Sequence, residues 1–69
     1  MVAEKPAIKT LLIVEDQLPT REALASVFRA EGYRVITATS RQEALRSLHS
    51  PAPPNLVVLD LRLAVNGSG

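Results

Sequence analysis

The sequence predicts an α/β fold, a doubly wound parallel sheet with the element order strand, helix, strand, helix, strand. Two short runs, 11–14 and 56–59, contain only leucine, isoleucine and valine, and an acidic residue follows each of them directly. Wholly apolar runs of this length are typical of strands buried on both faces. Segments with helical spacing of apolar residues alternate with the strands, and such an order implies parallel pairing through helical crossovers.

The first strand, over 11–14, leads into a helix predicted over about 19–31. Pro19 suits the first turn of this helix, and Gly32 suits the left-handed position after its last turn. Apolar residues at helical spacing give the face that we expect to be buried, Leu24, Val27 and Phe28.

The second strand is predicted over 35–39, where threonines alternate with apolar neighbours, which favours an edge position. Ser40 and Glu43 then fit a capping box, in which each side chain satisfies a free backbone donor near the other residue. They begin a short helix that ends near His49. Its apolar stripe consists of Ala44, Leu45 and Leu48.

The segment 50–54 contains three prolines and cannot continue a helix, so it is predicted to be a stiff connector to the third strand, 56–59. With the first strand in the middle, the strand order is 2-1-3, and right-handed crossovers place the two helices on opposite faces. We expect a lead-in over 1–9, a partial domain over 10–63 and an irregular, flexible tail over 64–69.

Composition narrows the classes of function. A chain of 69 residues allows one small domain, and with no cysteine and a single histidine it offers neither a disulfide framework nor a thiolate or histidine zinc site. The net charge of +1 with scattered basic residues argues against direct nucleic acid binding. The apolar runs are far shorter than the roughly 20 residues that span a bilayer. We therefore expect a soluble, cytoplasmic protein that does not contact a membrane.

Three carboxylates are predicted to meet at one edge of the sheet. Ligands of open parallel sheets bind beyond the carboxyl ends of the strands, where Glu15, Asp16 and Asp60 follow neighbouring strands. Like charges at such distances repel unless a cation or a proton compensates them, and hard oxygen ligands favour Mg²⁺. The alternative is that each acid merely ends a strand, caps a helix or faces water. The single Asp60 beside an adjacent acidic pair indicates a separate task for Asp60.

The first strand with its acidic pair, together with the segment 56–63, resembles the receiver domain of bacterial two-component response regulators. The resemblance covers about 9–63 and implies the N-terminal half of a flavodoxin-like domain with strand order 2-1-3-4-5. Strands 4 and 5, with the hydroxyl and lysine residues that contact the phosphoryl group in this family, are expected to lie beyond the sequence. Ala64 stands where the family normally carries a proline.

The resemblance also implies roles for individual residues. Asp60 would accept the phosphoryl group, Asp16 would bind Mg²⁺ directly, and Glu15 would act through bound water. Asp60 and the backbone carbonyl of Arg62 would be further ligands. The implied phosphodonor is a sensor histidine kinase or a phosphotransfer protein, and the implied function is a phosphorelay switch and not an enzyme.

A second hypothesis is a half domain, derived from a receiver, that is not phosphorylated and acts in self-association. The strand at 56–59 has the composition of an interior strand but is predicted to lie at a sheet edge, and exposed apolar edges recruit partners. A homodimer through this edge would cover it. A small metal-dependent phosphohydrolase is a third hypothesis, disfavoured because the sequence offers no general base for it.

Overall fold

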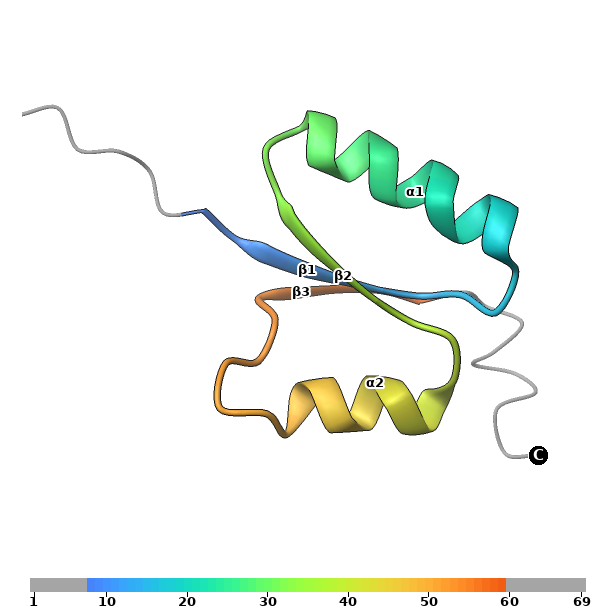
Figure 1. Cartoon of the computed structure of the whole chain (residues 1–69). Coiled ribbons are helices and arrows are strands. Elements are labelled where there is room, and N and C mark those ends of the chain that lie inside the picture. Colours follow the sequence, from blue (N-terminus) through green and yellow to red (C-terminus); the bar gives the residue numbers. More distant parts are fainter. Residues whose placement is uncertain (1–7, 60–69) are drawn as a thin grey trace, which may run out of the picture.

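The structure, a computed structural model, describes residues 8–59 and contains three strands and two helices (Figure 1). In chain order the elements are β1 (Thr10–Val14), α1 (Leu18–Ala30), β2 (Arg34–Ala38), α2 (Arg41–Leu48) and β3 (Leu56–Leu59). All strands are parallel and the sheet order is β2-β1-β3. The predicted fold class and strand order are therefore confirmed. The tail predicted over 64–69, and residues 60–63 of the partial domain, lie outside the described residues.

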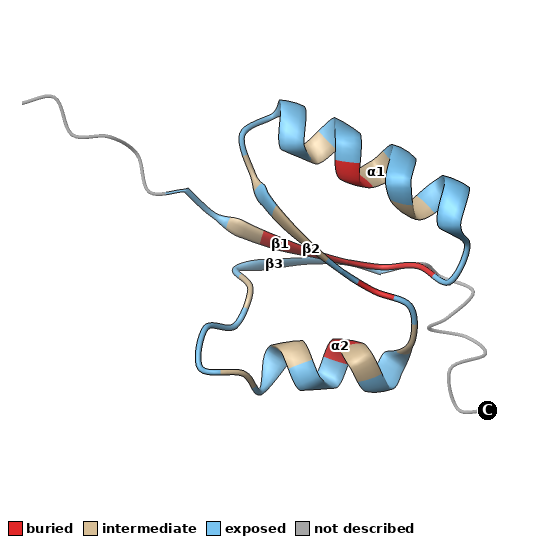
Figure 2. Ribbon diagram, viewed as in Figure 1, coloured by how far each residue is buried: buried red, intermediate tan, exposed pale blue. Residues whose placement is uncertain are grey.

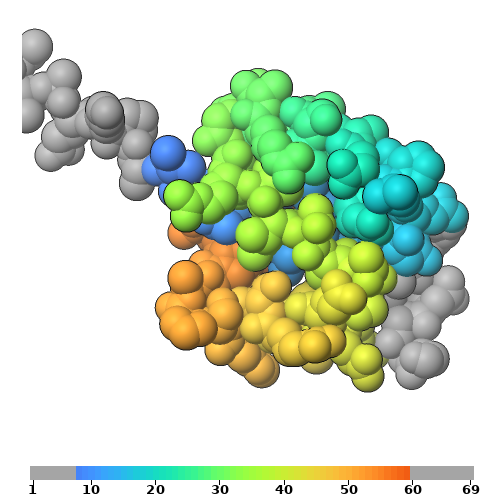
Figure 3. Space-filling view, in the orientation of Figure 1, coloured from blue at the N-terminus to red at the C-terminus, as the bar shows by residue number. Residues whose placement is uncertain are grey.

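The central strand β1 is the most deeply buried element. Leu11, Leu12, Ile13 and Val14 are each at most 2% exposed (Figure 2). In the space-filling view little of β1 is visible between β2 and the two helices (Figure 3). Burial on all sides explains why this run contains no polar residue, because an apolar side chain is stabilised by each contact that removes it from water.

Alternate residues of β1 point into two separate cores. Leu12 and Val14 pack with Ala38 and Ala44 on the face covered by α2. On the opposite face Leu11 and Ile13 pack with Ala25 of α1, and half-buried neighbours surround them. The helices thus cover opposite faces, as the right-handed crossovers predict (Figure 1).

The helices bury narrower faces than the sequence predicts. Val27 is 57% exposed, and the fully buried residue of α1 is Ala25, whose small side chain lets the helix approach the sheet closely. Leu24 and Phe28 flank it as predicted. In α2 only Ala44 is buried, and the two leucines of the predicted stripe are exposed, Leu45 at 46% and Leu48 at 39%.

The ends of the helices follow the predicted signals, with one difference. The hydroxyl of Ser40 accepts the Glu43 N–H at 3.2 Å, which is half of the predicted capping box. The Glu43 carboxylate, however, accepts both the N–H and the hydroxyl of Thr39, at 3.0 and 2.7 Å. The pairing of β2 with β1 ends at Ala38, one residue earlier than predicted.

The edge strand β3 is exposed on both faces. Leu56, Val57 and Leu59 are 42%, 47% and 49% exposed, and only Val58 reaches a core. The helices make most of their contacts with the sheet at β1 and β2, and of the β3 residues Val58 packs against the core beneath α1. Neither described helix is long and apolar enough to cross a membrane.

Gly32 provides a first test of the fold. It has φ of +98° directly after α1, where its N–H donates to the carbonyl of Arg29. Since a Cβ at this position would contact nothing within 4 Å, Gly32→Ala is expected to cost only backbone strain, about 1 kcal/mol in the free energy of unfolding. Gly32→Asn should recover part of this loss because asparagine tolerates the left-handed region. Urea unfolding of the three proteins measures this, and equal stability of the alanine variant would contradict it.

Candidate functional site

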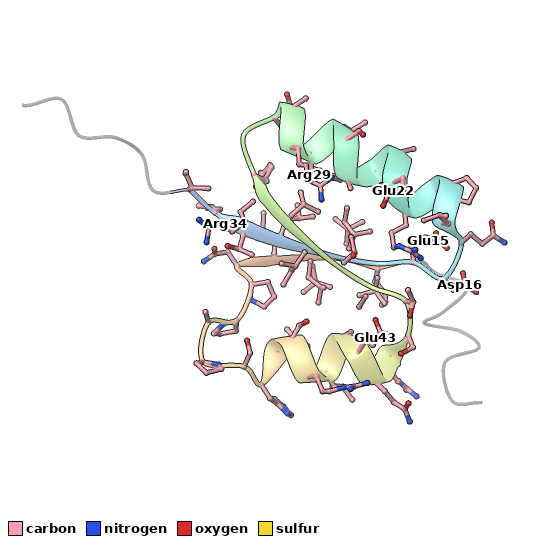
Figure 4. The ribbon with its side chains drawn as sticks, viewed as in Figure 1. Glu15, Asp16, Glu22, Arg29, Arg34 and Glu43 are labelled. Carbon is pink, nitrogen blue, oxygen red and sulfur yellow. The ribbon has the colours of Figure 1, made fainter. Side chains whose placement is uncertain are left out.

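Glu15 and Asp16 lie at the carboxyl end of β1, in the turn that leads to α1 (Figure 4). Their environments differ sharply, since Glu15 is 3% exposed and Asp16 is exposed. Glu43, at the start of α2, lies at the same end of the sheet (Figure 4). The structure therefore places the predicted acidic pair at the sheet edge where open parallel sheets bind ligands.

Hydrogen bonds of both its backbone and its side chain hold Glu15. Its N–H donates to the carbonyl of Ala38 at 3.0 Å, which extends the pairing of β1 with β2. Its carboxylate Oε2 accepts the N–H of Gln17 at 3.0 Å, and its carbonyl accepts a guanidinium N–H of Arg21 at 3.1 Å. A buried carboxylate is costly unless it is hydrogen-bonded, and the Gln17 N–H provides a hydrogen bond to this one.

The first turn of α1 adds positive potential beside the acidic pair. Gln17 is the N-cap residue, and within the described residues its side chain makes no capping hydrogen bond. The first turn also contains no acidic residue of its own. The acids that precede the helix therefore interact favourably with the positive end of the helix dipole. An anionic group beside this helix end is stabilised.

The pairing of β1 with β3 brings the ends of these strands together. Their last paired residues are Val14 and Leu59. The next residue of β1 is Glu15, and the chain continues from β3 into Asp60. Asp60 and Arg62, two of the predicted site residues, lie outside the described residues, so their places in the site stay predictions.

The described acids suit a hard divalent cation. Within residues 8–59 no group of three or more histidine, cysteine or acidic residues is close enough to hold a metal. The described part of the site thus supplies two carboxylates, Glu15 and Asp16. Mg²⁺ typically takes one or two carboxylates and keeps several waters, so the donor chemistry of this pair fits Mg²⁺.

The sequence reasoning missed two polar contacts at this edge. One joins Arg21 to the Glu15 carbonyl, and the other joins Glu43 to Thr39. The sequence did contain a signal for the first contact. Long side chains of a helix point back toward its N-terminus, so an arginine in the opening turns can reach the preceding strand end.

The Glu43 carboxyl has a pKa below its ordinary value. The main cause is the hydrogen bond from the backbone N–H of Thr39, followed by that from the Thr39 hydroxyl. Desolvation opposes these two hydrogen bonds and raises the pKa, and the positive charges of Arg46 and Arg21 lower it by smaller amounts.

A doubly wound parallel sheet with an acidic pair after its central strand defines a class of α/β proteins that bind ligands at this edge. The sequence matches the response regulator receiver domain over residues 11–68, and the chain belongs to this family. Receiver domains are switches of phosphorelay signalling and not classical enzymes. They generally bind Mg²⁺ at the phosphorylation site and interact with histidine kinases or phosphotransfer proteins.

Relatives of known function support this assignment. The chain is 47% identical over 53 residues to the aerobic respiration control protein ArcA of Escherichia coli, a match that covers 77% of this chain and 22% of ArcA. It is 40% identical over 74 residues to the alkaline phosphatase synthesis transcriptional regulatory protein SphR of Synechococcus elongatus, covering 94% of this chain and 28% of SphR. The chain therefore spans under a third of the length of these relatives. No solved structure matches it.

The contacts of Glu43 predict a pH-dependent stability. The pKa of Glu43 is lower in the folded protein than in the unfolded chain, so its ionised carboxylate stabilises the fold above the ordinary pKa of glutamate. This stabilisation is lost as the pH falls through the lower pKa of the folded state. Glu43→Gln is therefore expected to be less stable than the wild type at about pH 7, with a smaller difference at about pH 3.

Urea unfolding at both pH values measures this difference in stability. Gln42→Ala, an uncharged and exposed neighbour in the same turn, is the control and should change stability equally at both. A difference between wild type and Glu43→Gln that does not depend on pH would contradict the assigned cause.

Proposed function

We propose that this chain carries the phosphoacceptor site of a response regulator. Asp60 accepts a phosphoryl group from a sensor histidine kinase or a phosphotransfer protein. Mg²⁺ is held directly by Asp16, through water by Glu15, and further by Asp60 and the carbonyl of Arg62. The chain acts as a switch in the cytoplasm, in keeping with a sequence that lacks cysteine.

The observation that carries this proposal is the register of β1 against β3. These strands are parallel neighbours, and their last pair is Val14 with Leu59. Glu15 and Asp60 are the residues that directly follow these two strands in the sequence. Parallel neighbours in register deliver the residues that follow them to one edge, so this pairing supports a shared site for acids that are distant in sequence.

The environments of the two described acids support their different roles. Asp16 is exposed and can offer its oxygens to a hydrated cation. Glu15 is buried and its Oε2 is already engaged with the Gln17 N–H, which suits a ligand that acts through water. The burial of Glu15 therefore supports coordination of the cation through water, and the exposure of Asp16 supports direct coordination.

The chemistry required of Asp60 is nucleophilic. An oxygen of its carboxylate forms a bond to phosphorus while the bond from phosphorus to the donor breaks, and the donor leaves with that electron pair. When bound, Mg²⁺ neutralises charge on the transferred group. The residues of this chain supply the nucleophile and hold the acids in place, and no general base is needed because the carboxylate is already ionised.

Mg²⁺-dependent labelling with the small phosphodonor acetyl phosphate tests the role of Asp60. The wild type should take up an acid-stable, base-labile label, and a chelator or Asp60→Asn should abolish it, since an amide is a poor nucleophile. Glu22→Gln, which removes an exposed acid of α1, is the matched control and should label like the wild type. Equal labelling of wild type and Asp60→Asn would refute the proposal.

The exposed edge strand supports a second candidate function, self-association of a half domain that is not phosphorylated. Leu56 faces the α1 side of the sheet, and Val57 and Leu59 face the α2 side, yet all are more than two-fifths exposed. The strand carries no charge or proline, the residues by which natural edge strands avoid pairing. A second copy of the chain, pairing β3 with β3, would form a homodimer and cover this surface.

Sedimentation at low micromolar concentration tests this candidate. The wild type should sediment as a dimer, and Val57→Lys should sediment as a monomer because a charge at a paired edge is costly to bury. Val27→Lys, at an exposed valine of α1, is the matched control and should remain dimeric. A well-folded wild-type monomer would exclude self-association at this concentration.

A further inference from the structure

Arg21 joins helix α1 to the strand end that carries the acidic pair. Its backbone N–H donates to the carbonyl of Gln17 at 2.9 Å, the first hydrogen bond of the helix. Its guanidinium Nη1 donates to the carbonyl of Glu15 at 3.1 Å, six residues earlier in the chain. The same residue thus fixes the start of the helix and the carbonyl of the turn before it.

The contacts of Glu15 come from three parts of the fold. The Ala38 carbonyl belongs to β2, the Gln17 N–H belongs to the turn itself, and the Arg21 guanidinium belongs to α1. The first two bonds hold the N–H and the carboxylate of Glu15. The contact from Arg21 holds the carbonyl, and so it bears on the peptide unit that joins Glu15 to Asp16.

That peptide unit sets the direction of the exposed Asp16 carboxylate. Rotation of a peptide plane turns the residue that follows it, and a hydrogen-bonded carbonyl restricts this rotation. When a residue that orients a metal ligand without touching the metal is removed, the metal affinity typically falls by about 10- to 100-fold. Arg21 is placed to orient Asp16 in this way, through the Glu15 carbonyl.

The positive charge of Arg21 has the opposite effect on the affinity for a cation. A guanidinium near a cation site repels the cation, and this repulsion would weaken binding of Mg²⁺. Asp16 is exposed, however, so solvent and salt screen the repulsion, whereas the orienting hydrogen bond is part-buried and less affected. The positioning effect therefore outweighs the repulsion.

We propose that Arg21 is a positioning residue for the divalent cation, which holds the Glu15 carbonyl so that the Asp16 carboxylate is oriented before the cation binds. This inference rests on the proposed function, because it concerns the same Mg²⁺ site. It adds to that function a residue of α1 that contacts neither the cation nor the phosphoryl group.

Calorimetric titration of the full chain with Mg²⁺ tests this role. Arg21→Ala should raise the dissociation constant about 10-fold. Arg21→Lys, which keeps a long donor and the charge, should restore most of the affinity. Arg29→Ala removes an exposed arginine further along the same helix and should leave the affinity unchanged. Urea unfolding of each variant establishes that the protein titrated is folded.

The outcomes separate the two proposals. Mg²⁺ binding by wild type and by folded Arg21→Ala with equal affinity, or tighter binding by the variant, would overturn the positioning role while leaving the cation site intact. If Arg21→Ala does not fold, Arg21→Lys decides, since affinity no better than that of Arg21→Gln would also overturn it. A wild type that does not bind Mg²⁺ would overturn the proposed function, and the role of Arg21 with it.

Discussion

The burial of β1 between two strands and two helices is the constraint on which the rest of the structure depends. Four consecutive side chains of β1 are inaccessible to water, and they pack alternately into two cores on opposite faces of the sheet. Each core needs one helix to close it, which fixes the crossovers and the order β2-β1-β3. The same arrangement determines where polar chemistry can occur, because the first position at which β1 can carry a charge is the one directly after Val14.

Glu15 is the first residue of the candidate site and directly follows the buried strand. Its buried position is stabilised by hydrogen bonds to β2, to its own turn and to α1. Asp16, one residue further, remains exposed. In the proposed cation site, a buried, hydrogen-bonded acid next to an accessible one would reduce the cost of ordering the ligands on binding.

The sequence was sufficient for the strand order, both helix starts and the position of the acidic pair, because these depend on local patterns of apolar residues and turns. It was not sufficient for the helix faces. Ala44 is buried as predicted, but Val27 and Leu45 fit the apolar stripes and are exposed, whereas Ala25, which was not predicted, is buried, because the contact point of a helix on a sheet is a tertiary property. For the contact of Arg21 with Glu15, the sequence signals only that an arginine in the opening turns can reach back, and the angle at which α1 leaves the strand decides whether it does.

The central claim is that the ends of β1 and β3 share one divalent cation. Nuclear magnetic resonance of the ¹⁵N-labelled chain, titrated with paramagnetic Mn²⁺ in place of Mg²⁺, tests this directly, since amide signals near the bound ion broaden. Amides following Val14 and those following Leu59 should broaden together at the same low Mn²⁺ concentration, and the amide of Gly32 should be unaffected. Broadening at the end of only one of the two strands, or uniform weak broadening over the whole chain, would contradict it.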